Sequence, residues 1–163
     1  MRWGEFDVHL NFSDTTNLFG GGWWVAGEPT TVGDIDTLAK LGANATYNGS
    51  VLGTVINSGE MYDSSGELTM NWSFANRTGD LTISNFDARS YSTGANGLTQ
   101  PSLEFSGSLK QTGGESIGLT SGSVTGSFVN NGPVAAGGVM GKWGVEGDRY
   151  QATGVFGGTG TPR

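Results

Sequence analysis

The chain of 163 residues contains no cysteine. This absence excludes disulfide bonds, thiolate metal ligands and a cysteine nucleophile. It also removes the lipid-bearing cysteine that a bacterial surface lipoprotein carries at its mature N-terminus. A barrel-sized domain of this length can bury a complete core without disulfides or metals, so the lack of cysteine does not argue against a stable fold.

Basic residues are scarce as well. Lys and Arg total 8 against 15 Asp and Glu, and the net charge is −7. Nucleic acids and anionic membrane surfaces are bound through basic patches. We therefore expect neither of them to be a partner of this chain.

Long apolar runs and targeting signals are also missing. No run approaches the roughly 18 apolar residues of a transmembrane helix, and Met1-Arg2-Trp3-Gly4-Glu5 does not have the pattern of a signal peptide. The sequence begins within a strand-like alternation and ends in a Gly-Thr-Gly-Thr-Pro-Arg tail. These features favour a domain cut from a longer exported protein, with no transmembrane segment.

Glycine and aromatic residues, in contrast, are abundant. The chain has 30 Gly together with 5 Trp, 4 Tyr and 8 Phe, whereas glycine usually supplies roughly 7% of residues. Because the glycines are interleaved with aromatic side chains that can form a core, the composition predicts a folded all-β domain rather than a flexible linker.

Apolar residues alternate with polar ones in many segments, which is typical of strands with one buried face. In one such segment Leu68, Met70, Trp72 and Phe74 alternate with polar residues. The predicted strands cover residues 4–12, 19–26, 45–57, 66–76, 79–88, 102–111, 117–129, 137–146 and 149–157. Residues 91–101 are expected to form a longer loop.

One segment departs from this alternation. Ile35, Leu38 and Leu41 lie on one helical face, Thr30 or Thr31 can cap the start, and Gly42 follows the end. The spacing predicts a short helix near residues 33–41 that crosses between strands at one end of the fold.

Eight to nine strands joined mainly by hairpins predict an all-β fold, namely an eight-stranded antiparallel up-and-down β-barrel. We expect a single domain over residues 1–163, with the core barrel at about 19–158, an N-terminal strand at 3–12 and a disordered tail at 159–163. An eight-stranded barrel is just filled by its own side chains, here Met70, Trp72, Phe105 and Trp143. Glycines at inward positions would let the sheet coil or let a ring lie over the backbone; they are Gly49, Gly53, Gly107, Gly126, Gly141 and Gly154.

Several segments resemble the eight-stranded C-terminal barrel of the transferrin-binding protein B-like family of Gram-negative bacteria. The segments are Ala45–Gly49, Gly66–Ile83, Gly122–Phe128, Ala135–Gly141 and Tyr150–Gly158. They match a Tyr-x-Gly strand, a strand ending in an Asn-x-x-Gly-like turn, and a final Ala-x-Gly-Val-Phe-Gly strand. The sequence departs from the family at Val139-Met140, where a Phe is usual, and at Ala135-Ala136, where an acidic pair is common. The resemblance implies a barrel from a bacterial surface or secreted protein, and it carries over no named partner.

The candidate binding residues are Trp23, Trp24, Trp3 and His9. Neighbouring residues on a strand face opposite sides, so one of Trp23 and Trp24 should be in the core and the other outside. The outer one, with Trp3 nearby in the sequence, suits a partner anchor or a sugar-stacking platform. The alternative, which we favour slightly, is that it packs under the helix at 33–41. His9 is the only histidine and lacks a second histidine for a conventional zinc site.

No pair of carboxylates, phosphate loop or serine-nucleophile motif points to catalysis. We therefore predict no cofactor, no metal and no enzymatic activity. The expected function is that of a binding or display module on an extracellular or cell-surface protein of a Gram-negative bacterium. It would hold a protein or host-surface partner through its outer wall and the loops at 13–22, 57–66 and 89–101.

Two alternatives stay open at this point. One is a lipocalin-like carrier of an apolar ligand, for which haem is one option, and the other is a barrel cyclase or isomerase. Both require a hollow interior, and the enzyme also requires a titratable group with a perturbed pKa inside it. The sequence leaves the partner and the oligomeric state open.

Overall fold

The computed structural model describes residues 1–11 and 17–163, without the side chains of Trp3 and residues 6–21. Its elements are β1 (Arg2–Asn11), β2 (Asn17–Ala26), α1 (Val32–Lys40), β3 (Asn44–Asn57), β4 (Glu60–Ser73), β5 (Thr78–Phe86), β6 (Arg89–Ser92), β7 (Leu98–Thr99), β8 (Glu104–Ser108), β9 (Lys110–Gly113), β10 (Ser121–Asn131), β11 (Val134–Gly147) and β12 (Tyr150–Thr159).

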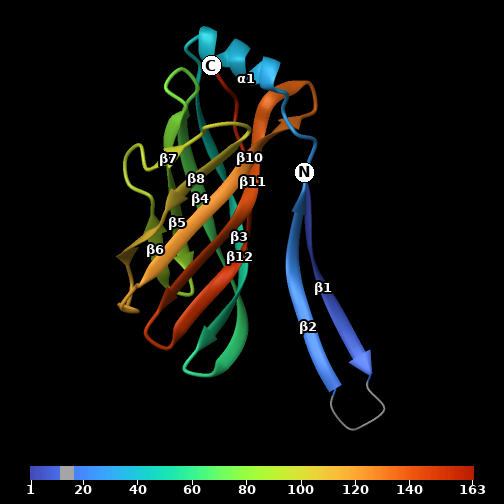
Figure 1. Cartoon of the computed structure of the whole chain (residues 1–163), viewed down its shortest axis with the longest axis vertical. Coiled ribbons are helices and arrows are strands. Elements are labelled where there is room, and N and C mark those ends of the chain that lie inside the picture. The colour runs from blue at the N-terminus through green and yellow to red at the C-terminus, as the bar shows by residue number, and fades with distance from the viewer. Residues whose placement is uncertain (12–16) are drawn as a thin grey trace.

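The large sheet closes into a ring of eight antiparallel strands (Figure 1). The order around the ring is β3, β4, β5, β7, β8, β10, β11 and β12, and β12 pairs with β3 to complete it. Chain order and spatial order are therefore the same, as in an up-and-down barrel. The predicted barrel with one short helix is confirmed.

The predicted loop at 91–101 is the main error within the barrel. This stretch contains β7 and the end of β6, so that β6 and β7 together act as one interrupted strand. β8 and β9 are likewise one strand broken at Leu109, and β6 pairs with β9. Because each piece has only two to five residues, the alternation is too short to be read from the sequence.

Aromatic side chains fill the interior. The ring centroids of Trp72 and Phe105 each lie within 6 Å of Phe128, at 5.2 and 5.3 Å. Toward the other end of the barrel, Phe86 lies edge-on to Trp143 at 4.6 Å. All four residues predicted to fill the interior, Met70, Trp72, Phe105 and Trp143, are buried.

The helix α1 lies across one end of the barrel (Figure 1). Thr31 is its N-cap, and the Asp34 amide donates to the Thr31 Oγ1 at 3.2 Å. Ile35 is buried in the barrel core, while Leu41 ends the helix and is 75% exposed. The predicted helix at 33–41 is thus confirmed within one residue at each end.

The first two strands form a separate two-stranded sheet beside the barrel (Figure 1). The prediction placed residues 19–26 in the core barrel, but β2 pairs with β1 instead. The physical reason is that eight strands from β3 onward already close the ring, so the barrel offers no free edge to β2. The β1–β2 hairpin is joined to the barrel just after the end of β2, where Pro29 bridges Val129 and the Thr30 amide donates to the Phe128 carbonyl at 3.0 Å.

The outer wall under β2 also differs from the expected polar surface. Val155 points outward by its position on β12 and is nevertheless buried, although it is not part of the interior cluster. The Trp23 Nε1 of β2 donates to the Thr54 Oγ1 of β3 at 3.2 Å. The β1–β2 hairpin is therefore packed on the outside of the barrel, where β12 pairs with β3.

Residues 159–163 were predicted to be a disordered tail, and they are hydrogen-bonded in the structure. The Gly160 amide donates to the Gly137 carbonyl, and Arg163 exchanges two backbone hydrogen bonds with Asn44 at 2.8 and 2.9 Å. The assignment of residues 1–163 to a single domain stays a prediction.

Two inward glycines make room for aromatic rings. A Cβ atom on Gly141 would collide with the Thr125 carbonyl oxygen and lie 2.5 Å from the Phe156 Cζ, and one on Gly126 would lie 2.6 Å from the Phe105 Cζ. At both positions an aromatic ring lies over the backbone of an inward glycine, as the sequence predicted. Gly144, three residues along the same strand β11, has only ordinary spacing around its Cβ position.

This contrast yields a matched pair of variants. We expect Gly141→Ala to lower the free energy of unfolding by about 1–3 kcal/mol, because overpacking forces the ring and the neighbouring backbone apart. Gly144→Ala should change it by less than about 0.5 kcal/mol. Urea denaturation followed by tryptophan fluorescence measures both, and equal stabilities of the two variants would contradict the packing argument.

Candidate binding site

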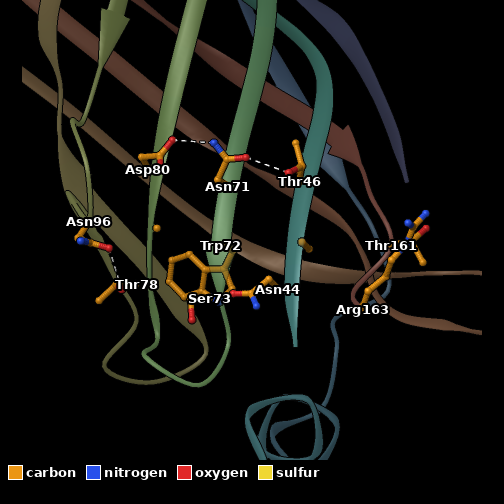
Figure 2. A pocket seen from close by; sticks show the side chains of 12 residues that line it. Asn44, Thr46, Asn71, Trp72, Ser73, Thr78, Asp80, Asn96, Thr161 and Arg163 are labelled. Carbon is orange, nitrogen blue, oxygen red and sulfur yellow. Dashed lines mark hydrogen bonds between the residues drawn. The ribbon is translucent and has the colours of Figure 1, made fainter. Parts of the chain in front are cut away.

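A polar groove lies on the outer wall of the barrel near the α1 end (Figure 2). Its volume is about 660 Å³. We call it the wall groove; it is lined by Asn44, Ala45, Thr46, Asn71, Trp72, Ser73, Thr78, Gly79, Asp80, Asn96, Thr161 and Arg163. The first part of β3, the last part of β4 and the first part of β5 form its floor, and the loop after β6 and the C-terminal tail border it.

Strand register places the polar side chains of the wall groove in one row. Thr46, Asn71 and Asp80 are direct cross-strand partners on β3, β4 and β5. The Thr46 Oγ1 donates to the Asn71 Oδ1 at 2.9 Å, and the Asn71 Nδ2 donates to the Asp80 Oδ2 at 3.0 Å (Figure 2). Both ends of the Asn71 amide are thus used to orient its neighbours.

The opposite end of the barrel carries an apolar surface, which we call the hairpin end. It consists of Ile56 and Met61, which face each other across β3 and β4, with Arg149 nearby. Met61 is 71% exposed and Ile56 is 39% exposed. A groove of about 420 Å³ lies between the 58–59 turn and the 148–149 turn, and the Ser58 amide donates to the Arg149 carbonyl to link these turns.

The hairpin end corrects the predicted loop at 57–66. Residues 60–66 belong to β4 and pair with β3, so only the turn at 58–59 interrupts the strands. β4 pairs with β5 only as far as Glu67 opposite Ser84. The first residues of β4 are therefore joined to the next part of the barrel wall by side chains rather than by a backbone ladder.

A mostly buried ion pair closes the wall at this place. The Asp87 carboxylate accepts from the Arg89 Nη1 at 2.5 Å, from the Tyr150 hydroxyl at 3.1 Å and from the Tyr62 hydroxyl at 3.1 and 3.2 Å. The Asp87 amide donates to the Ser64 Oγ at 3.2 Å. The Arg89 guanidinium also lies over the Tyr150 ring, 4.6 Å from its centroid.

Three of the four tyrosines have raised pKa values. Burial raises the pKa of Tyr47, whose hydroxyl donates to the Ala136 carbonyl at 2.7 Å. Burial also raises the pKa of Tyr91, and the pKa of Tyr150 is raised by burial and by the nearby Tyr91 hydroxyl and Asp87 carboxylate. These groups are neutral at physiological pH, so they contribute polarity and hydrogen bonds rather than charge.

The structure separates the two tryptophans that the sequence singled out. One was expected in the core, but neither is in the barrel interior: Trp23 packs on the outer wall at Thr54, and Trp24 is 41% exposed. The Trp24 indole lies on Gly4 of β1, with ring atoms 2.9–3.0 Å from the Cβ position of that glycine. A pocket of about 470 Å³ lies beside Trp24 and is also lined by Met1, Arg2, Asn131 and Thr159.

The two other candidates are placed only through the backbone. Trp3 is opposite Val25 and His9 is opposite Phe19 in the β1–β2 ladder. Their side chains lie outside the described part of the structure, as does part of the predicted 13–22 loop. The binding roles of Trp23, Trp24, Trp3 and His9 stay predictions.

Two kinds of feature are absent from the described residues. No three or more His, Cys, Asp or Glu side chains in residues 1–11 and 17–163 are arranged to hold a metal ion. Among the helices of the same residues, none has the length and apolar character that a bilayer crossing requires.

Sequence reasoning missed the wall groove, although its signal was present. The polar face of the strand containing Asn71 and Ser73 was recognised, but its register against Thr46 and Asp80 depends on the lengths of two hairpins. The borders come from residues far apart in the chain, Asn96 and Arg163, which no local pattern brings together.

By fold, this chain is a closed antiparallel up-and-down barrel with a side-chain-filled interior. The same fold occurs in HpuA from Kingella denitrificans, whose crystal structure was determined in complex with human haemoglobin. The TM-score is 0.55 at 20% sequence identity, and the alignment covers 90% of this chain and 51% of the HpuA chain. This chain therefore spans about half the length of that protein. No protein-family model matches the sequence, and no curated protein does either.

The mostly buried Asp87–Arg89 pair and the exposed Asp36–Arg77 pair give a second matched test. We expect Asp87→Ala to destabilise the protein by about 3 kcal/mol, because it leaves the mostly buried Arg89 without its closest counter-charge. The exposed pair of Asp36 and Arg77 has the same 2.5 Å separation, and Asp36→Ala should cost less than about 1 kcal/mol. Thermal unfolding by circular dichroism compares the two, and similar melting temperatures would contradict a stabilising role for the buried pair.

The raised tyrosine pKa values predict a loss of stability at alkaline pH. A folded-state pKa above the unfolded value of about 10 means that the unfolded chain releases its tyrosine protons first. Stability should be unaffected by these groups below about pH 10 and fall as the pH rises further. Absorbance at 295 nm should show Tyr47, Tyr91 and Tyr150 ionising together with the loss of near-ultraviolet circular dichroism. Ionisation of all the tyrosines in the still-folded protein would contradict this.

Proposed function

We propose that this chain is a non-enzymatic binding module of a surface or exported bacterial protein, and that it holds a protein partner through the hairpin end. The observation that carries the proposal is the filled interior, where aromatic rings meet across the barrel. Such a core gives a hollow carrier or a buried reaction centre no chamber. Binding is then left to the outer surfaces.

The composition of the hairpin end supports a protein as the partner. Methionine, aromatic residues and arginine are enriched in protein interfaces, and apolar anchors at the centre supply most of the affinity. Ile56 and Met61 form an exposed apolar pair, and Arg149 lines the groove beside Ile56. The side chains that close the barrel wall hold this region in place, so little order must be gained on binding.

The comparison supports the same class of function. HpuA shares the barrel fold and was crystallised with human haemoglobin, so human haemoglobin is the first partner to test. We place the chain on the surface of a Gram-negative bacterium or outside the cell, as part of a longer exported protein. Membership of the transferrin-binding protein B-like family, suggested by the sequence resemblance, is part of this proposal.

Biolayer interferometry of the purified chain against immobilised human haemoglobin tests the proposal. We expect saturable binding that Met61→Glu weakens at least about tenfold, or about 1.4 kcal/mol, because a charge would be buried at the apolar centre. Leu41→Glu is the control, since Leu41 is equally exposed at the α1 end. No saturable binding, or equal losses in both variants, would contradict the proposal.

A further inference from the structure

The wall groove differs in chemistry from the hairpin end. Nine of its twelve lining residues are polar or charged, namely Asn44, Thr46, Asn71, Ser73, Thr78, Asp80, Asn96, Thr161 and Arg163. The apolar members Ala45 and Trp72 are buried in the wall, at 7% and 3% exposure. The wall groove therefore has no exposed apolar anchor of the kind that protein interfaces use.

The two charged residues supply complementary hydrogen-bonding groups. The Asn71 amide fixes one oxygen of Asp80, and a carboxylate can accept several further hydrogen bonds. Across the groove, the backbone of Arg163 is fixed to Asn44, and its guanidinium carries five N–H donors. Neither Asp80 nor Arg163 is in an ion pair with any residue that the structure describes.

The hydroxyl and amide groups between them extend this set. Ser73 and Thr78 are cross-strand partners, and the Thr78 hydroxyl donates to the Asn96 Oδ1 at 3.3 Å. Ser73 and Thr78 lie on paired strands, as do Thr46, Asn71 and Asp80, so the spacing of these five groups is fixed before a ligand arrives. The volume of about 660 Å³ lies within the usual range for small-ligand pockets.

These properties define the class of ligand. Arg163 is the one basic side chain in the lining and Asp80 is an acid, so there is no cluster of positive charge to favour phosphate-rich ligands or other polyanions. A lining without apolar anchors disfavours a lipid or a protein hot spot. A ligand dense in hydroxyl groups matches alternating donors and acceptors at fixed spacing, because each hydroxyl both donates and accepts.

We propose that the wall groove binds a neutral saccharide chain, with Asp80 accepting from its hydroxyls and Arg163 donating to them. This site is at the opposite end of the β3–β4 pair from Met61 and adds a second ligand to the protein partner proposed above. Asn71 is a positioning residue that orients the Asp80 carboxylate.

Nuclear magnetic resonance titration of the whole chain tests this site. Maltotriose, cellotriose and triacetylchitotriose are each added to about 20 mM, well above a dissociation constant of about 1 mM. At least one of them should shift amide signals at 44–46, 71–73 and 78–80. Absence of shifts with all three, or shifts confined to another surface such as that around Trp24, would overturn the proposal.

The chain provides a matched control for the key carboxylate. Asp63 is also an outward Asp on the same wall, and its Oδ1 accepts from the Thr54 Oγ1 at 2.8 Å. We expect Asp80→Ala to weaken saccharide binding at least about tenfold and Asp63→Ala to leave it unchanged. Asp80→Asn keeps an acceptor and the fold, and it should give an intermediate affinity. Equal binding by Asp80→Ala and Asp63→Ala would overturn the assignment.

These experiments can refute the saccharide site and the protein site separately. Haemoglobin binding by Asp80→Ala should equal that of the unaltered chain, because Met61 lies at the other end of the barrel. Saccharide shifts should likewise persist in Met61→Glu. A loss of both activities in either variant would show that the two sites are not separate and would overturn this inference.

Discussion

Ten consecutive residue pairs join β12 to β3, from Tyr150 opposite Asn57 to Thr159 opposite Asn48. This antiparallel ladder closes the sheet, and closure fixes which residues of every strand point inward. Because the side-chain period of a strand is two, a slip of one residue would turn the aromatic face of a strand outward. The filled core and the division of each strand into an inward and an outward face follow from this closure.

The ring is not equally regular along its length. Toward the α1 end, β3, β4 and β5 are joined by continuous ladders, and the wall groove lies on this regularly paired part. Toward the hairpin end the β4–β5 ladder stops, and Tyr62, Asp87 and Tyr150 complete the wall through side chains. A charged and aromatic cluster thus does locally what backbone hydrogen bonds do elsewhere. The apolar pair Ile56 and Met61 stands beside this irregular region.

The parts of the fold that the sequence predicted are those with long, uninterrupted alternation. Five strands have ten or more residues each, namely β3, β4, β10, β11 and β12. Their alternation of apolar and polar residues could therefore be recognised, and their inward residues were identified correctly. The helix was predicted from its cap and spacing. The short pieces β6 and β7 were missed, and β2 was assigned to the barrel because local patterning does not say which sheet a strand joins.

The site was less predictable than the fold for a related reason. Trp23 and Trp24 drew attention as a local pair, yet their surroundings depend on how the first hairpin docks on the outer wall. Asp87 and Arg89 are close in sequence, but the cluster needs Tyr62 and Tyr150 from distant strands. A cluster whose members come from several strands produces no pattern in any single segment of the sequence.

The positions of the two chain ends have a consequence for orientation. Both lie toward the α1 end of the molecule, and the Arg163 backbone is bonded to Asn44 at the start of β3 (Figure 1). A tether or neighbouring domain attached at either terminus would therefore be connected at the α1 end of the molecule. The turns at 58–59 and 148–149 would then point away from the attachment, toward whatever approaches from solution.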